Sequence, residues 1–90
     1  VTRGGHAHLQ LEQVIVAVSG TIAFMTEDLQ GNKAEFILDS PEKGLYIPKH
    51  IWRDLKFSHN AVLLCLASEK YSEGDYIREY EKFLILKDEY

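Results

Sequence analysis

The sequence predicts an all-β fold, an antiparallel barrel or sandwich of short strands that is followed by one C-terminal helix. Three observations carry this prediction. Short runs of β-branched and apolar residues, separated by turn residues, recur up to about residue 70. Several of these runs alternate apolar and polar positions, as strands with one buried face do. Only the C-terminal segment changes to the apolar spacing of a helix.

The expected strands follow one another closely along the chain. They are "EQVIVAV", "TIAFMTE", "KAEFILD", "LYIP", "IWRDLKF" and "AVLLCLAS". The intervening segments "DLQGN", "SPEKG" and "SHN" are rich in Gly, Asn, Ser and Pro, which favour turns. Because "AVLLCLAS" is so apolar, we expect it to be the most buried strand, with Cys65 as a buried and unreactive thiol.

The C-terminal segment "SEGDYIREYEKFLIL" predicts a helix over about 73–86. Five apolar residues fall on one stripe of that helix, namely Tyr76, Ile77, Tyr80, Phe83 and Leu84. Ser72 and Asp75 have the spacing of a capping box, with Asp in place of the usual Glu. We therefore expect a single domain over residues 1–90, with its β part over about 1–70.

Composition excludes several classes of function. The formal net charge is −4 and no run of the sequence is basic, so we expect no nucleic-acid partner. The longest apolar runs are far too short to cross a bilayer, so we expect no membrane span. One cysteine cannot form an intramolecular disulfide, which is typical of a reducing, cytoplasmic location.

Two histidines precede the first apolar strand and are separated by one residue. On a strand, His6 and His8 would face the same side, about 6.6 Å apart, while Ala7 would face away. Gly4 and Gly5 would let the backbone bend just before the pair. Two imidazoles on one face suit either metal binding or acid–base chemistry, because imidazole is a common metal ligand and titrates near neutral pH.

The spacing resembles the first motif of the cupins, which are jelly-roll β-barrels. The residues of that motif are here His6, His8, Glu12 and Gly20. Gly44 and Pro48 fit the second cupin motif, but Arg53 stands where its metal-binding histidine is expected, and His50 lies in a different register. An arginine is always protonated and is a poor metal ligand. The resemblance therefore implies a cupin-type antiparallel β-barrel whose cavity has lost part of its metal shell.

A more specific resemblance covers nearly the whole chain, from Arg3 to about Leu84. "RGGHAH", "VSG", "GLYIP", "AVLLCLAS" and "DYIREY" occur in the same order in the sugar-nucleotide 3,4-ketoisomerases, small cupins that act on dTDP-4-keto-6-deoxy-glucose. Two departures are visible. Leu9 stands where the family commonly has Lys, and the family's N-terminal strands, which carry an active-site tyrosine, are missing from the sequence given.

The resemblance implies an isomerase without cofactor or metal that moves a keto group from C4 to C3 in deoxyamino-sugar and surface-polysaccharide biosynthesis. The ketone acidifies the C3 hydrogen, so two titratable groups on one face suffice for the carbon steps. We expect His8 to be the base and His6 its partner in proton relay, although the two roles can be exchanged. The expected substrate contacts are Arg3, Tyr46, Trp52 and Arg53.

Two alternatives remain open from the sequence. One is a metal-binding cupin enzyme that uses His6, His8 and Glu12. The other is a non-catalytic cupin domain that binds a nucleotide sugar without turning it over. In each case we expect a homodimer, with exchanged strands as one form of it, because open strand edges in a small barrel are commonly covered by another chain.

Overall fold

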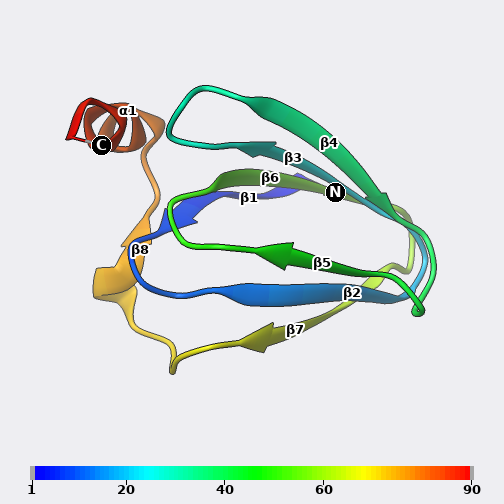
Figure 1. Cartoon of the computed structure of the whole chain (residues 1–90). Helices are drawn as coiled ribbons and strands as arrows, with labels where there is room; N and C mark the ends of the chain where they lie inside the picture. The colour runs from blue at the N-terminus through cyan, green and yellow to red at the C-terminus, as the bar shows by residue number, and fades with distance from the viewer. Residues whose placement is uncertain (1, 90) are drawn as a thin grey trace.

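Two β-sheets, built from eight short strands, and one short α-helix make up the fold (Figure 1). The computed structural model describes residues 2–89, with side chains for residues 4–89. The strands are β1 (Thr2–His8), β2 (Gln13–Ser19), β3 (Ile22–Glu27), β4 (Lys33–Leu38), β5 (Gly44–Ile47), β6 (Trp52–Phe57), β7 (Val62–Ala67) and β8 (Tyr76–Ile77). A 3₁₀ turn, η1 (Glu73–Asp75), precedes β8, and helix α1 (Tyr80–Glu89) follows it.

The two sheets lie face to face. One has the order β4-β3-β6-β1-β8 and the other has the order β5-β2-β7. All pairings between these strands are antiparallel. Over the described residues the sheets do not close into one barrel, because β4 and β8 end the first sheet and β5 and β7 end the second. The expected all-β, jelly-roll type of fold with a C-terminal helix is thus confirmed as a two-layer arrangement.

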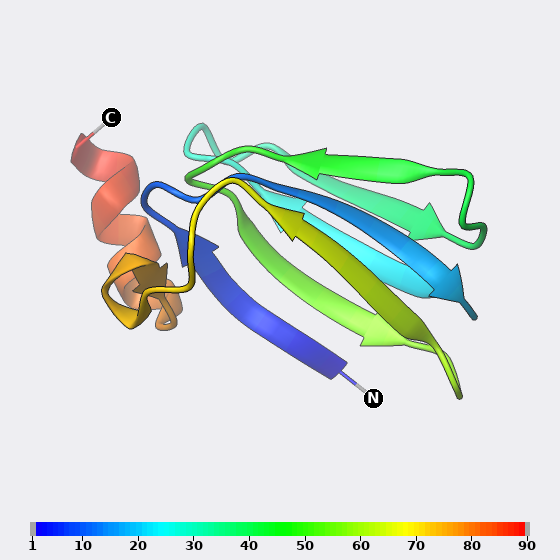
Figure 2. The same cartoon turned by 90° about the horizontal axis from the view of Figure 1, so that it is seen from below.

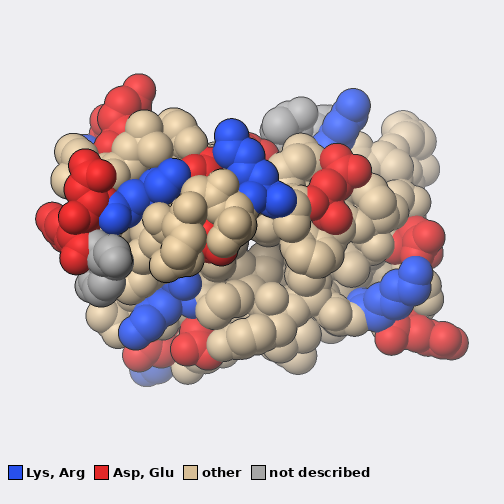
Figure 3. Space-filling view, turned by 45° about the horizontal axis from the view of Figure 1, so that its top comes forward, with Lys and Arg blue, Asp and Glu red and all other residues tan. Residues whose placement is uncertain are grey.

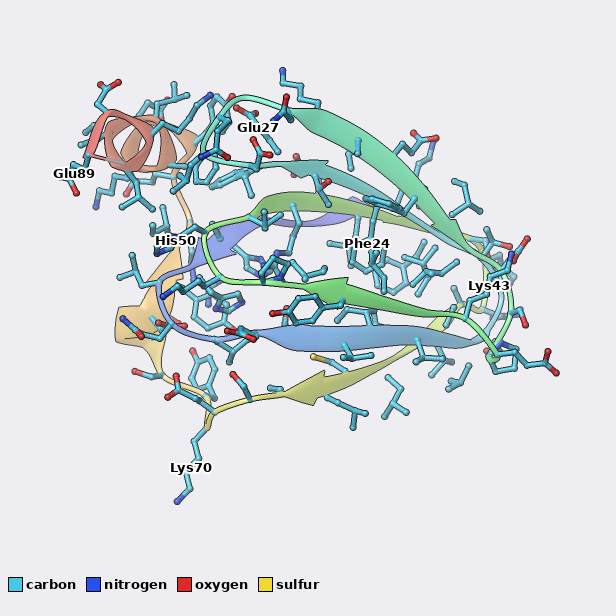
Figure 4. The ribbon with its side chains drawn as sticks, in the orientation of Figure 1. Phe24, Glu27, Lys43, His50, Lys70 and Glu89 are labelled. Atoms are coloured by element: carbon cyan, nitrogen blue, oxygen red, sulfur yellow. The ribbon has the colours of Figure 1, made fainter. Side chains whose placement is uncertain are left out.

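The hydrophobic core fills the space between the sheets, where Figure 4 shows Phe24. Its buried members are Ile15, Ala17, Ile22, Phe24, Leu38, Ile47 and Leu55. They come from β2, β3, β4, β5 and β6, at alternate positions within β2 and β3, because successive side chains of a strand face opposite sides. The buried positions of β2 and β3 thus follow the two-residue period of a strand.

The helix starts later than the expected range of about 73–86. Tyr76 and Ile77 do not join the helix, because they pair with His8 and Ala7 as strand β8. No side chain caps η1 at Ser72, so the expected capping box is wrong. The apolar residues do have helical spacing. Tyr76 and Ile77 nevertheless form a strand, because they pair with β1, and only the residues from Tyr80 onward form the helix.

Helix α1 lies against one end of the five-stranded sheet (Figure 2). Phe83 is fully buried and packs with Ala7 and Trp52. Glu27, at the end of β3, accepts hydrogen bonds from the Tyr80 hydroxyl at 2.7 Å and the Lys87 amine at 2.8 Å. The helix is therefore held by both apolar packing and a nearly buried ion pair.

The strand expected to be most buried is instead an edge strand. β7 pairs only with β2 among the described strands, and most of its residues are exposed. Cys65 is exposed rather than buried, so its prediction as a buried thiol is wrong. Apolar residues on both faces of a strand signalled burial in the sequence, but here they produce an apolar surface.

The surface carries interspersed charges of both signs. Figure 3 shows acidic and basic side chains next to one another on the face that it presents, with no continuous basic area there. Across residues 2–89, no helix has the length and apolar character needed to span a bilayer.

A histidine pair and a buried arginine between the sheets

A bulge in β1 sets the direction of the two histidines. Gly4 lies opposite Asp54 and His6 lies opposite Arg53, so Gly5 is an extra residue with no partner of its own. Both glycines have positive φ, 93° at Gly4 and 69° at Gly5, which side chains disfavour. A Cβ on Gly4 would also lie 3.0 Å from the carbonyl oxygen of Arg53. The Gly-Gly pair is thus required where the strand shifts its register.

The histidines lie side by side on one face of β1, as predicted. Their ring centroids are 4.9 Å apart and the rings meet edge to face at 84°. His8 is fully buried, while Ala7 between them faces the other way and packs with Phe83. Neither ring nitrogen of His8 has an aligned hydrogen-bond partner among the described residues. Buried polar atoms are rarely left unpaired, so these nitrogens mark the position of a site.

Tyr76 packs against both imidazoles. Its ring centroid lies 4.3 Å from that of His8 and 5.2 Å from that of His6. The Arg78 guanidinium lies 4.1 Å from the centre of the same ring, on which it makes a cation–π contact. The Tyr76 ring of β8 therefore forms one side of the site around the two histidines.

Arg53 brings a buried positive charge to the histidines. Its side chain is only 2% exposed, and its guanidinium donates hydrogen bonds to the Gln13 side-chain oxygen and to the Ile51 carbonyl. Its Nε has no partner, and no carboxylate forms an ion pair with it within the described part of the chain. A buried cation without a countercharge is costly, so this position is suited to an anionic ligand.

Burial and Arg53 keep the two imidazoles neutral. Loss of solvent, the charge of Arg53 and the charge of His8 lower the pKa of His6 to about 4. Loss of solvent and Arg53 also lower the pKa of His8, although Asp75 acts in the opposite direction. Burial lowers the pKa of Arg53 itself to about 10, at which it stays charged at neutral pH. The site thus combines two neutral bases with one fixed cation at pH 7.

Asp75 binds the backbone that follows β1 and lies beside His8. Its carboxylate accepts hydrogen bonds from the backbone N–H groups of Gln10, at 2.7 Å, and Leu11, at 3.1 Å. The same carboxylate lies 3.3 Å from Nδ1 of His8. Because Nδ1 has no aligned hydrogen-bond partner, the contact is an electrostatic pairing.

Two predicted substrate contacts, Trp52 and Tyr46, have described contacts away from the histidines. Trp52 packs on the opposite face with Ala7 and Phe83, and lines a groove of about 690 Å³ near α1. Tyr46 is exposed and donates a hydrogen bond to Glu12. The side chain of Arg3 lies outside the described residues. Contacts of these residues with a substrate stay predictions, whereas Arg53 lies at the site.

Glu12, the third ligand of the alternative metal site, is bound to Tyr46 rather than to either histidine. Its carboxylate is engaged by the Tyr46 hydroxyl at 2.7 Å. Within residues 2–89, no three His, Cys, Asp or Glu side chains are grouped so that they could hold a metal ion. The residues present here do not assemble the ligand set that the metal-cupin alternative requires.

Sequence reasoning missed the contributions of Asp75, Tyr76 and Gln13 to this site. Gln13 accepts from Arg53 and also contacts the Cys65 sulfur at 3.0 Å, so it ties β6 to β7 through β2. The available signal was the segment "DYIREY", which lies within the range predicted as helix. Its first two residues instead lie beside His8, across a large sequence separation.

The arrangement is suited to moving protons next to developing negative charge. A neutral imidazole can take a proton, and a desolvated guanidinium can stabilise an oxyanion. The fold and site thus define a small jelly-roll protein that holds two neutral imidazoles and a buried guanidinium between its sheets. The family model described as "FdtA: WxcM-like, C-terminal" matches residues 1–88, and the chain belongs to this family.

Two known proteins are similar to the chain over most of its length. The chain is 45% identical over 83 residues to the TDP-4-oxo-6-deoxy-alpha-D-glucose-3,4-oxoisomerase of Aneurinibacillus thermoaerophilus, covering 90% of this chain and 58% of the relative. A 3,4-ketoisomerase from Helicobacter canadensis superposes with a TM-score of 0.92 at 40% identity, covering 98% of this chain and 66% of that one.

A second solved structure includes a sugar nucleotide. It is a variant of the 3,4-ketoisomerase QdtA from Thermoanaerobacterium thermosaccharolyticum, in complex with TDP-4-keto-6-deoxyglucose. The TM-score is 0.92 at 34% identity, and the match covers 99% of this chain and 64% of that one. The chain thus spans roughly three-fifths to two-thirds of the length of these relatives.

Proposed function

We propose that the protein is a sugar-nucleotide 3,4-ketoisomerase that acts on a dTDP-4-keto-6-deoxy-hexose. The observation that carries the proposal is the group formed by His6, His8 and Arg53, two neutral imidazoles beside a buried cation without a countercharge. The named activities of the relatives support the same reaction, and the bound ligand of QdtA supports the same substrate class.

The proposed reaction transfers one carbon-bound proton. His8 takes the proton from C3, and the electron pair of that C–H bond forms a C3–C4 double bond as the C4 carbonyl becomes an enediolate. The guanidinium of Arg53 stabilises the negative oxygen. A proton is then delivered to C4, the proton of the C3 hydroxyl passes to the C4 oxygen, and the products are a C3 ketone and a C4 hydroxyl. His6, 4.9 Å from His8 between ring centroids, is the partner in this relay.

The proposed chemistry needs neither cofactor nor metal. The ketone already acidifies the neighbouring C–H bond, and a fixed cation and hydrogen-bond donors can hold the enediolate. We place the reaction in the cytoplasm, a reducing compartment that suits the free thiol of Cys65.

The direct test is incubation of the purified protein with dTDP-4-keto-6-deoxy-glucose, followed by NMR. We expect signals of the 3-keto isomer, and in D₂O we expect deuterium at C4 wherever the transferred proton exchanges with solvent. Tight binding of the nucleotide sugar without any isomer would contradict the proposal and favour the non-catalytic binding domain.

We also propose a homodimer. The outer face of the three-stranded sheet exposes an apolar group of side chains, which are Val14, Tyr46, Val62, Leu64 and Leu66. β7 adds an open strand edge to this face, and both features favour association with a second copy, including exchange of strands. Sedimentation should show a dimer at micromolar concentration, and a clean monomer there would contradict this proposal.

A matched pair of variants locates the dimer surface. Leu66 on β7 and Ile85 on α1 are each 59% exposed. We expect Leu66→Lys to weaken the dimer and Ile85→Lys to leave it unchanged, because a charge is costly only where the other subunit covers it. Equal sedimentation of both variants and the wild type would place the interface elsewhere.

A further inference from the structure

Asp75 is fixed by several backbone hydrogen bonds from the end of β1. Three consecutive residues after His8 donate backbone hydrogen bonds to it. Leu9 donates to its carbonyl oxygen at 3.0 Å, and Gln10 and Leu11 donate to the two oxygens of its carboxylate. The carboxylate is therefore fixed with respect to the end of β1, which carries His8.

The imidazole of His8 is confined on its other sides. Tyr76 and His6 both meet the ring edge to face, at 4.3 Å and 4.9 Å between centroids. The backbone of His8 pairs with that of Tyr76, next to Asp75 in the chain. One ring nitrogen, Nδ1, lies 3.3 Å from the Asp75 carboxylate, and Nε2 has no hydrogen-bond partner among the described residues.

The two nitrogens of a neutral imidazole have different roles, because one carries the proton and the other accepts. The hydrogen bond or charge beside one nitrogen decides which of them is protonated. We infer that Asp75 is a positioning residue for His8, which favours the proton on Nδ1 and leaves Nε2 as the atom that takes the proton of the substrate. This inference rests on the proposed function, since it assigns a role within that reaction.

The charged and titratable groups around His8 act in both directions. Arg53 on β6 and Arg78 after β8 disfavour a protonated His8, and a charge on His8 in turn lowers the pKa of His6 on β1. Asp75 provides the opposing negative charge, while the Tyr76 ring packs against the imidazole. Asp75 therefore has a second effect: it stabilises the imidazolium that forms once His8 has accepted a proton.

The chain offers a matched control for the Asp75 variant. Asp28, in the turn between β3 and β4, also accepts backbone hydrogen bonds, from Gln30 and Asn32 at 2.9 Å each. Asp28→Asn and Asp75→Asn thus remove the same charge from the same kind of turn cap. A histidine lies beside Asp75, whereas the hydrogen-bond partners of the Asp28 carboxylate are Gln30 and Asn32.

The first experiment is long-range ¹H–¹⁵N NMR of the histidine rings at pH 7.5, with the His8 signals assigned by their loss in His8→Asn. We expect the wild-type ring to carry its proton on Nδ1, and Asp75→Asn to move a substantial fraction of it to Nε2. Asp28→Asn should match the wild type. A wild-type His8 protonated on Nε2 would overturn the inference, and this observation needs no folded variant.

The second experiment is the pH profile of kcat and kcat/KM. Asp75→Asn should lower kcat by about 10-fold or more, less than His8→Asn does, with a smaller change in KM. Its acidic limb should move to lower pH, because the charge that favours protonated His8 is lost. A variant that lost rate with unchanged limb and tautomer would show a merely structural Asp75. Absence of turnover in the wild type, with the expected tautomer, would contradict the proposed function instead.

Discussion

Lowering the pH from 8 to 5 should destabilise the protein, and His6 should account for a large part of the loss. The pKa of His6 is about 4 in the folded protein, mainly because of burial and Arg53, and its ordinary value is 6.5. The unfolded chain therefore binds a proton between pH 6.5 and 4 that the folded chain does not bind. The contribution is fully present above pH 6.5 and is lost as the pH falls toward 4.

The magnitude follows from these two values. At pH 5 the unfolded imidazole is almost fully protonated and the folded one is mostly neutral, which costs at most about 2 kcal/mol relative to pH 8. Solvent screening at the partly exposed ring reduces this figure. Urea unfolding at pH 8 and pH 5, at one protein concentration, measures the loss for each variant.

Two variants isolate the contribution of His6. His6→Gln should lose up to about 2 kcal/mol less than the wild type between the two pH values, because its side chain does not titrate. His59→Gln, which removes an exposed imidazole from the turn between β6 and β7, should behave as the wild type does. If His6→Gln shows the full pH dependence of the wild type, the neutral, desolvated state of His6 is refuted.

Three further outcomes are expected. His8→Asn should lower turnover by at least about 100-fold with little change in affinity for dTDP, measured by steady-state kinetics and calorimetry; a near-wild-type rate would remove His8 from the proton transfer. Treatment with a strong chelator should leave the rate unchanged, and Glu12→Gln should cost much less than His8→Asn; loss of activity restored by one divalent ion would favour a metal mechanism instead. Phe83→Ala should cost about 3–5 kcal/mol of unfolding free energy, since Phe83 is fully buried under α1; a loss below about 1 kcal/mol would show that α1 packs loosely.

Local patterns in the sequence predicted the strands well. The runs "TIAFMTE" and "KAEFILD" form β3 and β4, and the single-residue spacing of His6 and His8 placed both imidazoles on one face. Each of these features depends on residues within a few positions of one another. Strand geometry alone then fixes which side chains share a face.

Features that depend on distant pairing were not predictable in this way. β7 has the composition of a central strand, yet its exposure follows from having only β2 as a described neighbour. Tyr76 has helical spacing relative to Tyr80 and Phe83, but its pairing with His8 makes it a strand residue. The low pKa of His6 is of the same kind, because it depends on desolvation and on Arg53 from another strand.

The extra residue in β1 decides which side of the sheet the imidazoles of His6 and His8 face. Asp54, opposite Gly4, is on the same side of its strand as Trp52, whose indole nitrogen donates to it at 3.3 Å. An uninterrupted alternation from Gly4 would place both imidazoles on that outer side. The bulge at Gly5 shifts the alternation of side chains by one residue, so that His6 lies beside Arg53 between the sheets. A substitution at Gly5 that restored regular pairing would place residue 5 opposite Arg53 and turn both imidazoles outward, so one residue decides which side of the sheet they occupy.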